Sequence, residues 1–131
     1  MHTKLIVALD VNSFDRAKVL VDKLSPAVDI FKVGSVLFTS LGPKIIEYIN
    51  EKGKKVFLDF KFLDIPNTVR KATLSAAEHN VFMLTLHITG GLHMLKEAVS
   101  GVGDRKNRPL LVGVTVLTST EVENTTEEVL K

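Results

Sequence analysis

The chain has 131 residues, 45% of them hydrophobic, and its 17 basic against 15 acidic residues give a formal net charge of +2. This composition suits a single domain, residues 1–131, with a real hydrophobic core, and it excludes a disordered chain. No apolar run approaches the roughly 18 residues of a membrane span, and no signal peptide is indicated. The absence of cysteine excludes disulfides, thiolate metal sites and cysteine nucleophiles, and it fits a cytoplasmic protein.

The basic residues are scattered along the chain, and only residues 104–108 form a locally basic run. No aromatic side chains are interleaved with that run, as they would be in many nucleic-acid-binding surfaces. The composition therefore favours neither a nucleic acid nor a membrane as a partner.

Strand and helix patterns alternate from one end of the chain to the other. Short apolar runs rich in β-branched residues predict strands, and a segment of helical period follows each one. The predicted strands cover residues 5–9, 28–33, 56–58, 81–86 and 110–116. Helices are predicted from a cap at Asn12 or Ser13 to Pro26, from Pro43 to Gly53, after Pro66, and from Gly91 to a breaker at 101–103.

The spacing of these units indicates the architecture. The predicted strands begin near residues 5, 28, 56, 81 and 110, so consecutive starts are separated by 23, 28, 25 and 29 residues. Such βα units require parallel strands covered by helices, in an open doubly wound sheet or a (β/α)8 barrel. Eight such units would need roughly 210 residues, so a barrel would be only about five-eighths present. A capping box at 120–123 and a helical pattern at 127–131 that stops with the chain favour the incomplete barrel.

Charged side chains follow the third predicted strand. Asp59, Lys61 and Asp64 come directly after its apolar residues. Strand alternation places Asp59 and Lys61 on one face, with Phe60 and Phe62 on the other. Because buried charge is unfavourable unless it is paired, the sequence predicts an Asp/Lys/Asp site at the end of this strand. A solvated ion pair on an edge strand is the alternative.

Residues 59–68 resemble the Asp-x-Lys-x-x-Asp-Ile-Pro-x-Thr signature of the orotidine 5'-phosphate decarboxylase family, which catalyses the last step of UMP synthesis. Residues 8–10, 31–34, 87–91 and 114–119 resemble further segments of that family in the same order. The resemblance covers the whole chain but only about the first half of the family's barrel. It implies a partial TIM (β/α)8 barrel, no cofactor, no metal, and decarboxylation of orotidine 5'-phosphate.

The chemistry explains why these charges should converge. Loss of CO2 from the orotate ring leaves negative charge on C6, so a fixed cation must stabilise it and deliver a proton. Lys61 is the candidate donor, and Asp59 or Asp64 would keep it protonated. The resemblance places Asp59 against the departing carboxylate as well.

The resemblance also implies a set of substrate contacts. Asp10 and Lys32 would bind the ribose hydroxyls, Thr118 would contact the pyrimidine, and Asn67 and Thr68 would complete the binding residues. Taken alone, Asp10 could equally be a turn residue, Lys32 an ordinary lysine at a strand end, and Thr118 a helix-capping hydroxyl.

In the family the site is shared across a homodimer, which implies that Asp64, Ile65 and Thr68 serve the neighbouring subunit. The family's phosphate-binding Arg and Gln follow the seventh and eighth strands, so the isolated chain is expected to turn over poorly or not at all. Two alternatives come from other classes. One is a metal-dependent sugar-phosphate lyase of the same superfamily, whose strand-end acids would bind Mg²⁺. The other is a non-catalytic half-barrel that self-associates through its open edges.

Overall fold

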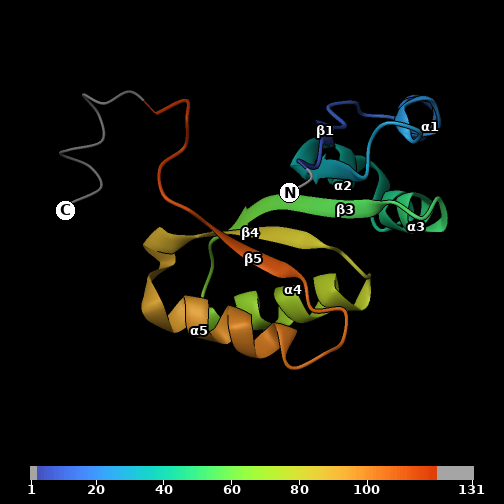
Figure 1. Ribbon diagram of the computed structural model, residues 1–131. Coiled ribbons are helices and arrows are strands. Elements are labelled where there is room, and N and C mark those ends of the chain that lie inside the picture. The colour runs from blue at the N-terminus through green and yellow to red at the C-terminus, as the bar shows by residue number, and fades with distance from the viewer. Residues whose placement is uncertain (1–2, 121–131) are drawn as a thin grey trace.

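A computed structural model describes residues 3–120 of the chain (Figure 1). Its centre is a parallel five-stranded sheet in which the strands follow one another in chain order. The strands are β1 (Ile6–Ala8), β2 (Ile30–Gly34), β3 (Lys55–Phe62), β4 (Met83–His87) and β5 (Leu110–Val114). The predicted alternation of strand and helix is therefore confirmed, and β1 and β5 form the two open edges of the sheet.

The helices connect consecutive strands, as parallel pairing requires. They are α1 (Phe14–Leu24), α2 (Ser35–Leu41), α3 (Lys44–Glu51), α4 (Pro66–Glu78), the short 3-10 helix η1 (Ile88–Gly90) and α5 (Gly91–Val102). Of the two predicted caps, Ser13 begins α1, because its hydroxyl accepts a hydrogen bond from the Arg16 N–H at 3.4 Å. Pro66 opens α4 at the first helical position, where its missing N–H is not needed.

Several boundaries differ from the prediction. Helix α2 was not predicted, because its seven residues are too few to show a period and include poor helix formers such as Ser35 and Thr39. Strand β3 continues to Phe62 instead of stopping at residue 58. Helix α5 continues through Gly101, which was predicted to begin the breaker. The glycine is instead needed for the close packing of α5 against α4, because a Cβ there would collide with the Arg70 carbonyl. The predicted capping box at 120–123 extends beyond the described residues, and the helical pattern at 127–131 lies outside them.

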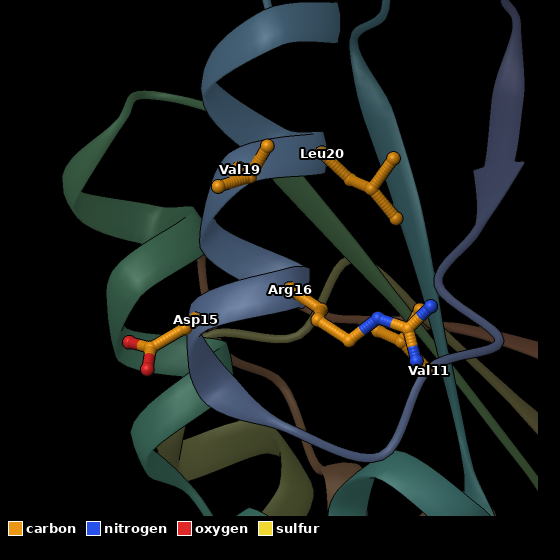
Figure 2. A pocket seen from close by; sticks show the side chains of 5 residues that line it. All are labelled: Val11, Asp15, Arg16, Val19 and Leu20. Carbon is orange, nitrogen blue, oxygen red and sulfur yellow. The ribbon is translucent and has the colours of Figure 1, made fainter.

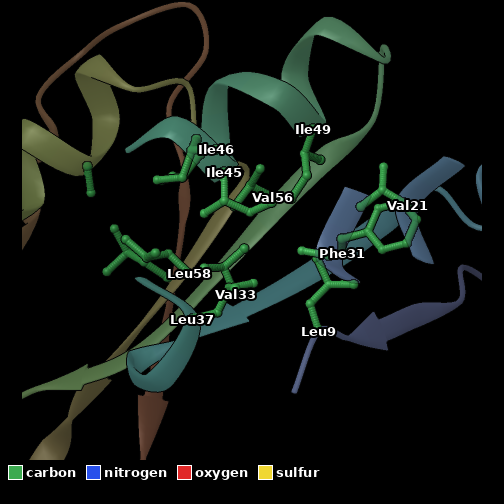
Figure 3. Packing of buried hydrophobic residues seen from close by; sticks show 14 of the residues in the cluster. Leu9, Val21, Phe31, Val33, Leu37, Ile45, Ile46, Ile49, Val56 and Leu58 are labelled. Atoms are coloured by element: carbon green, nitrogen blue, oxygen red, sulfur yellow. The ribbon is translucent and has the colours of Figure 1, made fainter. Parts of the chain in front are cut away.

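One face of the sheet carries the core (Figure 3). By strand alternation Phe31, Val33, Val56 and Leu58 share this face, and each is at most 3% exposed. Helices α1 and α3 cover it with Val21, Ile45, Ile46 and Ile49, which are equally buried. Burying each such side chain contributes about 1.5–3 kcal/mol. This packing holds β2 and β3 rigid at the point where their charged residues begin.

The opposite face and the edges of the sheet are more open. Leu110 and Val112 of β5 are 54% and 38% exposed, and Ile6 of β1 is 39% exposed. Parallel strands are normally buried on both faces, so these apolar residues are unusual. No helix within residues 3–120 is long and apolar enough to cross a membrane.

Candidate active site

The charged residues lie where β3 leaves its regular pairing with β4. Between the paired positions Leu58–Leu84 and Phe62–Leu86, β3 advances four residues while β4 advances two. Strand β3 therefore bulges by two residues. Lys61 lies in this bulge with φ at 51°, a left-handed conformation that costs about 1–3 kcal/mol for a residue other than glycine. Such strain concentrates at functional sites, which makes the bulge the first candidate.

Two aromatic residues anchor the other side of the bulge. The rings of Phe60 and Phe62 lie edge to face at 5.6 Å, and Phe60 packs against Phe38 of α2 at 4.8 Å. Asp59 and Lys61 face each other on the opposite side. The predicted assignment of faces is therefore correct, although the strand between them is not regular.

Thr85 of β4 lies opposite the bulge and supports it. Its hydroxyl accepts a hydrogen bond from the Lys61 backbone N–H at 2.8 Å and donates one to Asp59 Oδ1 at 3.0 Å. Thr85 is 4% exposed, and a buried N–H without a partner would cost about 1–3 kcal/mol. The conformation of β3 at this point thus depends on a side chain of the next strand.

Asp59 lies between two lysines. Lys61 Nζ is 2.9 Å from Asp59 Oδ1, and Lys32 Nζ is 3.5 Å from Asp59 Oδ2. Burial opposes ionisation of Asp59, but hydrogen bonds from Lys61 and Thr85 and the charges of both lysines together hold its pKa below the ordinary value. Asp59 is therefore a fixed anion at neutral pH with a cation at each oxygen.

A hollow of about 200 Å³ opens beside this cluster. Asp10, Lys32, Asp59 and Lys61 line it, so the charged residues come from β2, β3 and the segment after β1. Sites in parallel α/β folds form where such strand ends meet. The Lys61 side chain is 36% exposed, so its ammonium is accessible from the hollow. The arrangement offers a ligand one accessible proton donor beside a fixed carboxylate.

The other predicted residues lie outside this hollow. Asp64 is exposed, and its Oδ1 accepts a hydrogen bond from the Ile65 N–H at 2.6 Å. Asn67 and Thr68 are exposed in the first turn of α4, and Thr118 is exposed in a turn after β5. None of these residues lines the hollow. Of the two carboxylates considered as partners of Lys61, the structure therefore places Asp59 beside it.

Two polar residues of the site were not predicted from the sequence. Thr85 is a hydroxyl within the apolar run 81–86, and that interruption of the pattern was the available signal. Ser35 lines the hollow at the start of α2, a helix too short to be recognised.

A larger hollow of about 360 Å³ lies beside α1 and has a different chemistry. It is lined by Val11, Asp15, Arg16, Val19 and Leu20. Figure 2 shows Asp15 and Arg16 pointing to opposite sides of the helix. Small-molecule sites need polar groups that converge on the ligand, and this surface lacks them. The smaller hollow beside Asp59 is the better candidate.

The described residues do not form a metal centre. Within residues 3–120, no group of three His, Asp or Glu side chains is close enough to hold a metal ion. Asp59 already faces Lys32 and Lys61, and their positive charges oppose the binding of a cation next to it.

The fold and the cluster define an α/β protein with a charged site at the strand ends of a parallel sheet. A family model described as "Orotidine 5'-phosphate decarboxylase / HUMPS family" matches residues 3–131. The chain belongs to this family.

Known relatives agree with this assignment. An orotidine 5'-phosphate decarboxylase of Legionella pneumophila (strain Paris) is 54% identical over 124 residues, which cover 92% of this chain and 53% of that protein. The crystal structure of orotidine 5'-phosphate decarboxylase from Lactobacillus acidophilus has a TM-score of 0.82 at 33% identity, covering 97% of this chain and 59% of that one. The Methanocaldococcus jannaschii enzyme, complexed with inhibitor BMP, has a TM-score of 0.78 at 33% identity, covering 86% and 51% of the two chains.

These relatives also put the observed sheet in context. The chain spans about half the length of the curated relatives it matches. Its five parallel strands match part of the larger structures with high TM-scores, which confirms the predicted partial (β/α)8 barrel.

Proposed function

We propose that the charged cluster of Lys32, Asp59 and Lys61 decarboxylates orotidine 5'-phosphate to UMP. The cluster acts within a complete barrel, of which residues 1–131 form the N-terminal part. The observation that carries this proposal is the Lys61 ammonium, 2.9 Å from Asp59 and accessible from the hollow. Loss of CO2 leaves an electron pair on C6 of the pyrimidine. Lys61 stabilises that charge and then protonates C6 from Nζ, which completes the product.

The other residues of the cluster hold and orient the reacting groups. Asp59 keeps the ammonium in place and lies against the departing carboxylate, where repulsion between the two anions disfavours the bound substrate relative to the transition state. Lys32 offsets part of this negative charge and, with Asp10, binds the ribose hydroxyls. Thr118 contacts the pyrimidine.

The proposal is tested in a chimera that joins this chain to the remaining part of the Legionella pneumophila relative. We expect Lys61→Ala to reduce decarboxylation by at least about 10²–10⁴-fold, because it removes the proton donor, while UMP binding stays measurable. Lys23→Ala, in an exposed position near the end of α1, is the matched control. Robust turnover by the Lys61→Ala chimera would refute the role of Lys61.

We expect residues 1–131 alone to turn over poorly or not at all. Binding energy from a remote phosphate contributes to stabilising the transition state, and the family's phosphate-binding residues belong to the later strands. Release of CO2 from carboxyl-labelled substrate measures this directly. Activity of the isolated chain near that of the chimera would contradict the expectation.

We also propose that the active form is a homodimer with shared sites. Asp64, Ile65 and Thr68 are exposed and lie outside the hollow, as residues that act in a neighbouring subunit would. Mixing inactive Lys61→Ala and Asp64→Ala chimeras would then rebuild one intact site in each heterodimer and restore up to about a quarter of the activity. If mixing restores nothing, the sites are not shared.

A second candidate function is self-association of this chain through the edges of its sheet. The exposed apolar residues of β1 and β5 favour it, as does a hollow of about 380 Å³ beside β5 lined by Val99, Arg108, Pro109, Leu110 and Leu111. Pairing of β5 of one copy with β1 of a second would continue the parallel sheet. Light scattering should then show a dimer that Val112→Lys dissociates, and a monomer at all concentrations would exclude it.

The metal-dependent sugar-phosphate lyase is distinguished from the decarboxylase by a chelator. Loss of the chimera's activity in EDTA and its recovery with Mg²⁺ would select the lyase.

A further inference from the structure

Thr85 is one of two polar residues that are buried within residues 3–120, and the other is Thr73 of α4. The Thr73 hydroxyl shares its one proton between the carbonyls of Arg70 and Ala98, at 3.0 and 3.1 Å, and so joins α4 to α5. The Thr85 hydroxyl instead contacts the two residues at the centre of the charged cluster. The two threonines are both buried, Thr73 at 0% and Thr85 at 4% exposed, but have different surroundings, which makes Thr73 a natural control for Thr85.

The direction of the hydrogen bonds at Thr85 is determined by chemistry. A backbone N–H only donates, so Thr85 Oγ1 accepts from Lys61 N at 2.8 Å. The hydroxyl has one proton, which is then free to be donated to Asp59 Oδ1 at 3.0 Å. Asp59 is ionised and only accepts, so neither contact competes with the other.

These hydrogen bonds form a closed ring that includes both the backbone N–H and the side-chain ammonium of Lys61. The Lys61 backbone is bound to Thr85, Thr85 is bound to Asp59, and Asp59 Oδ1 accepts from Lys61 Nζ at 2.9 Å. The same carboxylate oxygen therefore receives the ammonium directly and is linked to the backbone of Lys61 through one hydroxyl. Without Thr85, the left-handed backbone of Lys61 would lose the partner that holds its N–H.

We infer that Thr85 is a positioning residue for the proposed reaction, which holds the Lys61 bulge so that its ammonium stays against Asp59 at the hollow. The catalytic role of Thr85 rests on the proposed function. The hydrogen bonds of Thr85 to Lys61 and Asp59 can be tested without measuring turnover. When Lys61 transfers its proton to C6, Asp59 still accepts a hydrogen bond from Thr85 and faces Lys32, so its carboxylate remains an anion beside the neutral amine.

The first test uses the 131-residue chain and needs no turnover. In Thr85→Val, which keeps the shape but removes the hydroxyl, amide exchange at Lys61 should accelerate by about tenfold, because its hydrogen bond is lost. The pKa of Asp59, followed by carboxyl NMR, should rise toward its ordinary value, since a hydrogen bond to the ionised form is lost. Thr85→Ser keeps the hydroxyl and should restore both readouts.

Thr73→Val is the matched control, because it removes the hydroxyl of another buried threonine, away from the cluster. It should lower stability without changing Lys61 exchange or the titration of Asp59. Equal changes in Thr73→Val and Thr85→Val would mean a general loss of packing and would overturn the inference. If Thr85→Val does not fold, the unaltered chain still decides, since rapid exchange of the Lys61 amide in the folded protein contradicts the proposed hydrogen bond.

The second test measures kinetics in the chimera with the Legionella pneumophila relative. Thr85→Val should lower kcat by up to about 100-fold through misplacement of the ammonium and change KM little, and Thr85→Ser should recover most of kcat. An unchanged kcat, with the Asp59 titration shifted, would overturn the positioning role while leaving the proposed function intact. A chimera that is inactive even without substitutions refutes the proposed function, and the NMR readouts then still test the geometry.

Discussion

The two halves of β3 show how one strand divides between stability and chemistry. In its first half, Val56 and Leu58 are 0% and 3% exposed and pair in regular register with β2, and Leu58 also pairs with β4. In its second half, β3 leaves its register with β4, and Asp59 and Lys61 form the charged cluster. The buried half gains its free energy from packing. The bulged half has a strained backbone at Lys61, which lowers the stability of the chain. The site therefore needs the rigid, well-packed strand that precedes it.

The largest expected effect comes from the regular half. Leu58→Ala should lower the free energy of unfolding by about 2–5 kcal/mol, because it leaves a cavity in the core. Leu63→Ala is the control, since Leu63 is 56% exposed and its truncation should change stability little. Chemical denaturation measures both. Equal losses in the two variants would show that the first half of β3 does not gain its stability from packing in the core.

A smaller effect on stability should distinguish the strained backbone at Lys61 from the regular backbone in the first half of β3. Both Lys61→Ala and Lys61→Gly remove the ion pair, but glycine adopts a φ of 51° without strain, so Lys61→Gly should be more stable by about 1 kcal/mol.

Lys55, in the regular half of β3, provides the matched pair for this comparison. There Lys55→Gly should be less stable than Lys55→Ala by about 0.5–1 kcal/mol, because glycine loses more conformational entropy in a strand. The same order at both positions would show that the bulge is not strained.

The smallest effect concerns pH. The pKa of Asp59 is lowered in the folded chain, so its ion pairs stabilise fully above the unfolded value of about 3.8 and are lost as the pH falls through the folded value. The difference in stability between the parent chain and Asp59→Asn should therefore shrink below about pH 4, by about 1 kcal/mol or less.

Asp22 would also contribute to the pH dependence of stability, so its contribution must be eliminated. Its pKa is also lowered, mainly by hydrogen bonds from Lys52 and Tyr48, so Asp22→Asn serves as the common background. A difference that is constant from pH 2 to 6 would show that Asp59 is not paired in the folded chain.

The order of the elements could be predicted because it depends on local patterns. Alternation at two residues and recurrence at three and four mark the strands and helices directly in the chain. A helix as short as α2 has no such period. Its appearance between β2 and α3 depends on the burial of Leu37 against the sheet, which is a tertiary contact.

The sequence by itself determined the parallel βα architecture, the membership in the family and the presence of Asp59, Lys61 and Asp64 in one segment, which the structure places in the second half of β3 and just after it. Only the tertiary structure decided which carboxylate lies beside Lys61 and that Thr85 holds both partners. The physical reason is that the bulge arises from the pairing of β3 with β4, between residues 24 to 26 positions apart. Local spacing carries no information about a register at that distance, and the register decides where the ammonium lies.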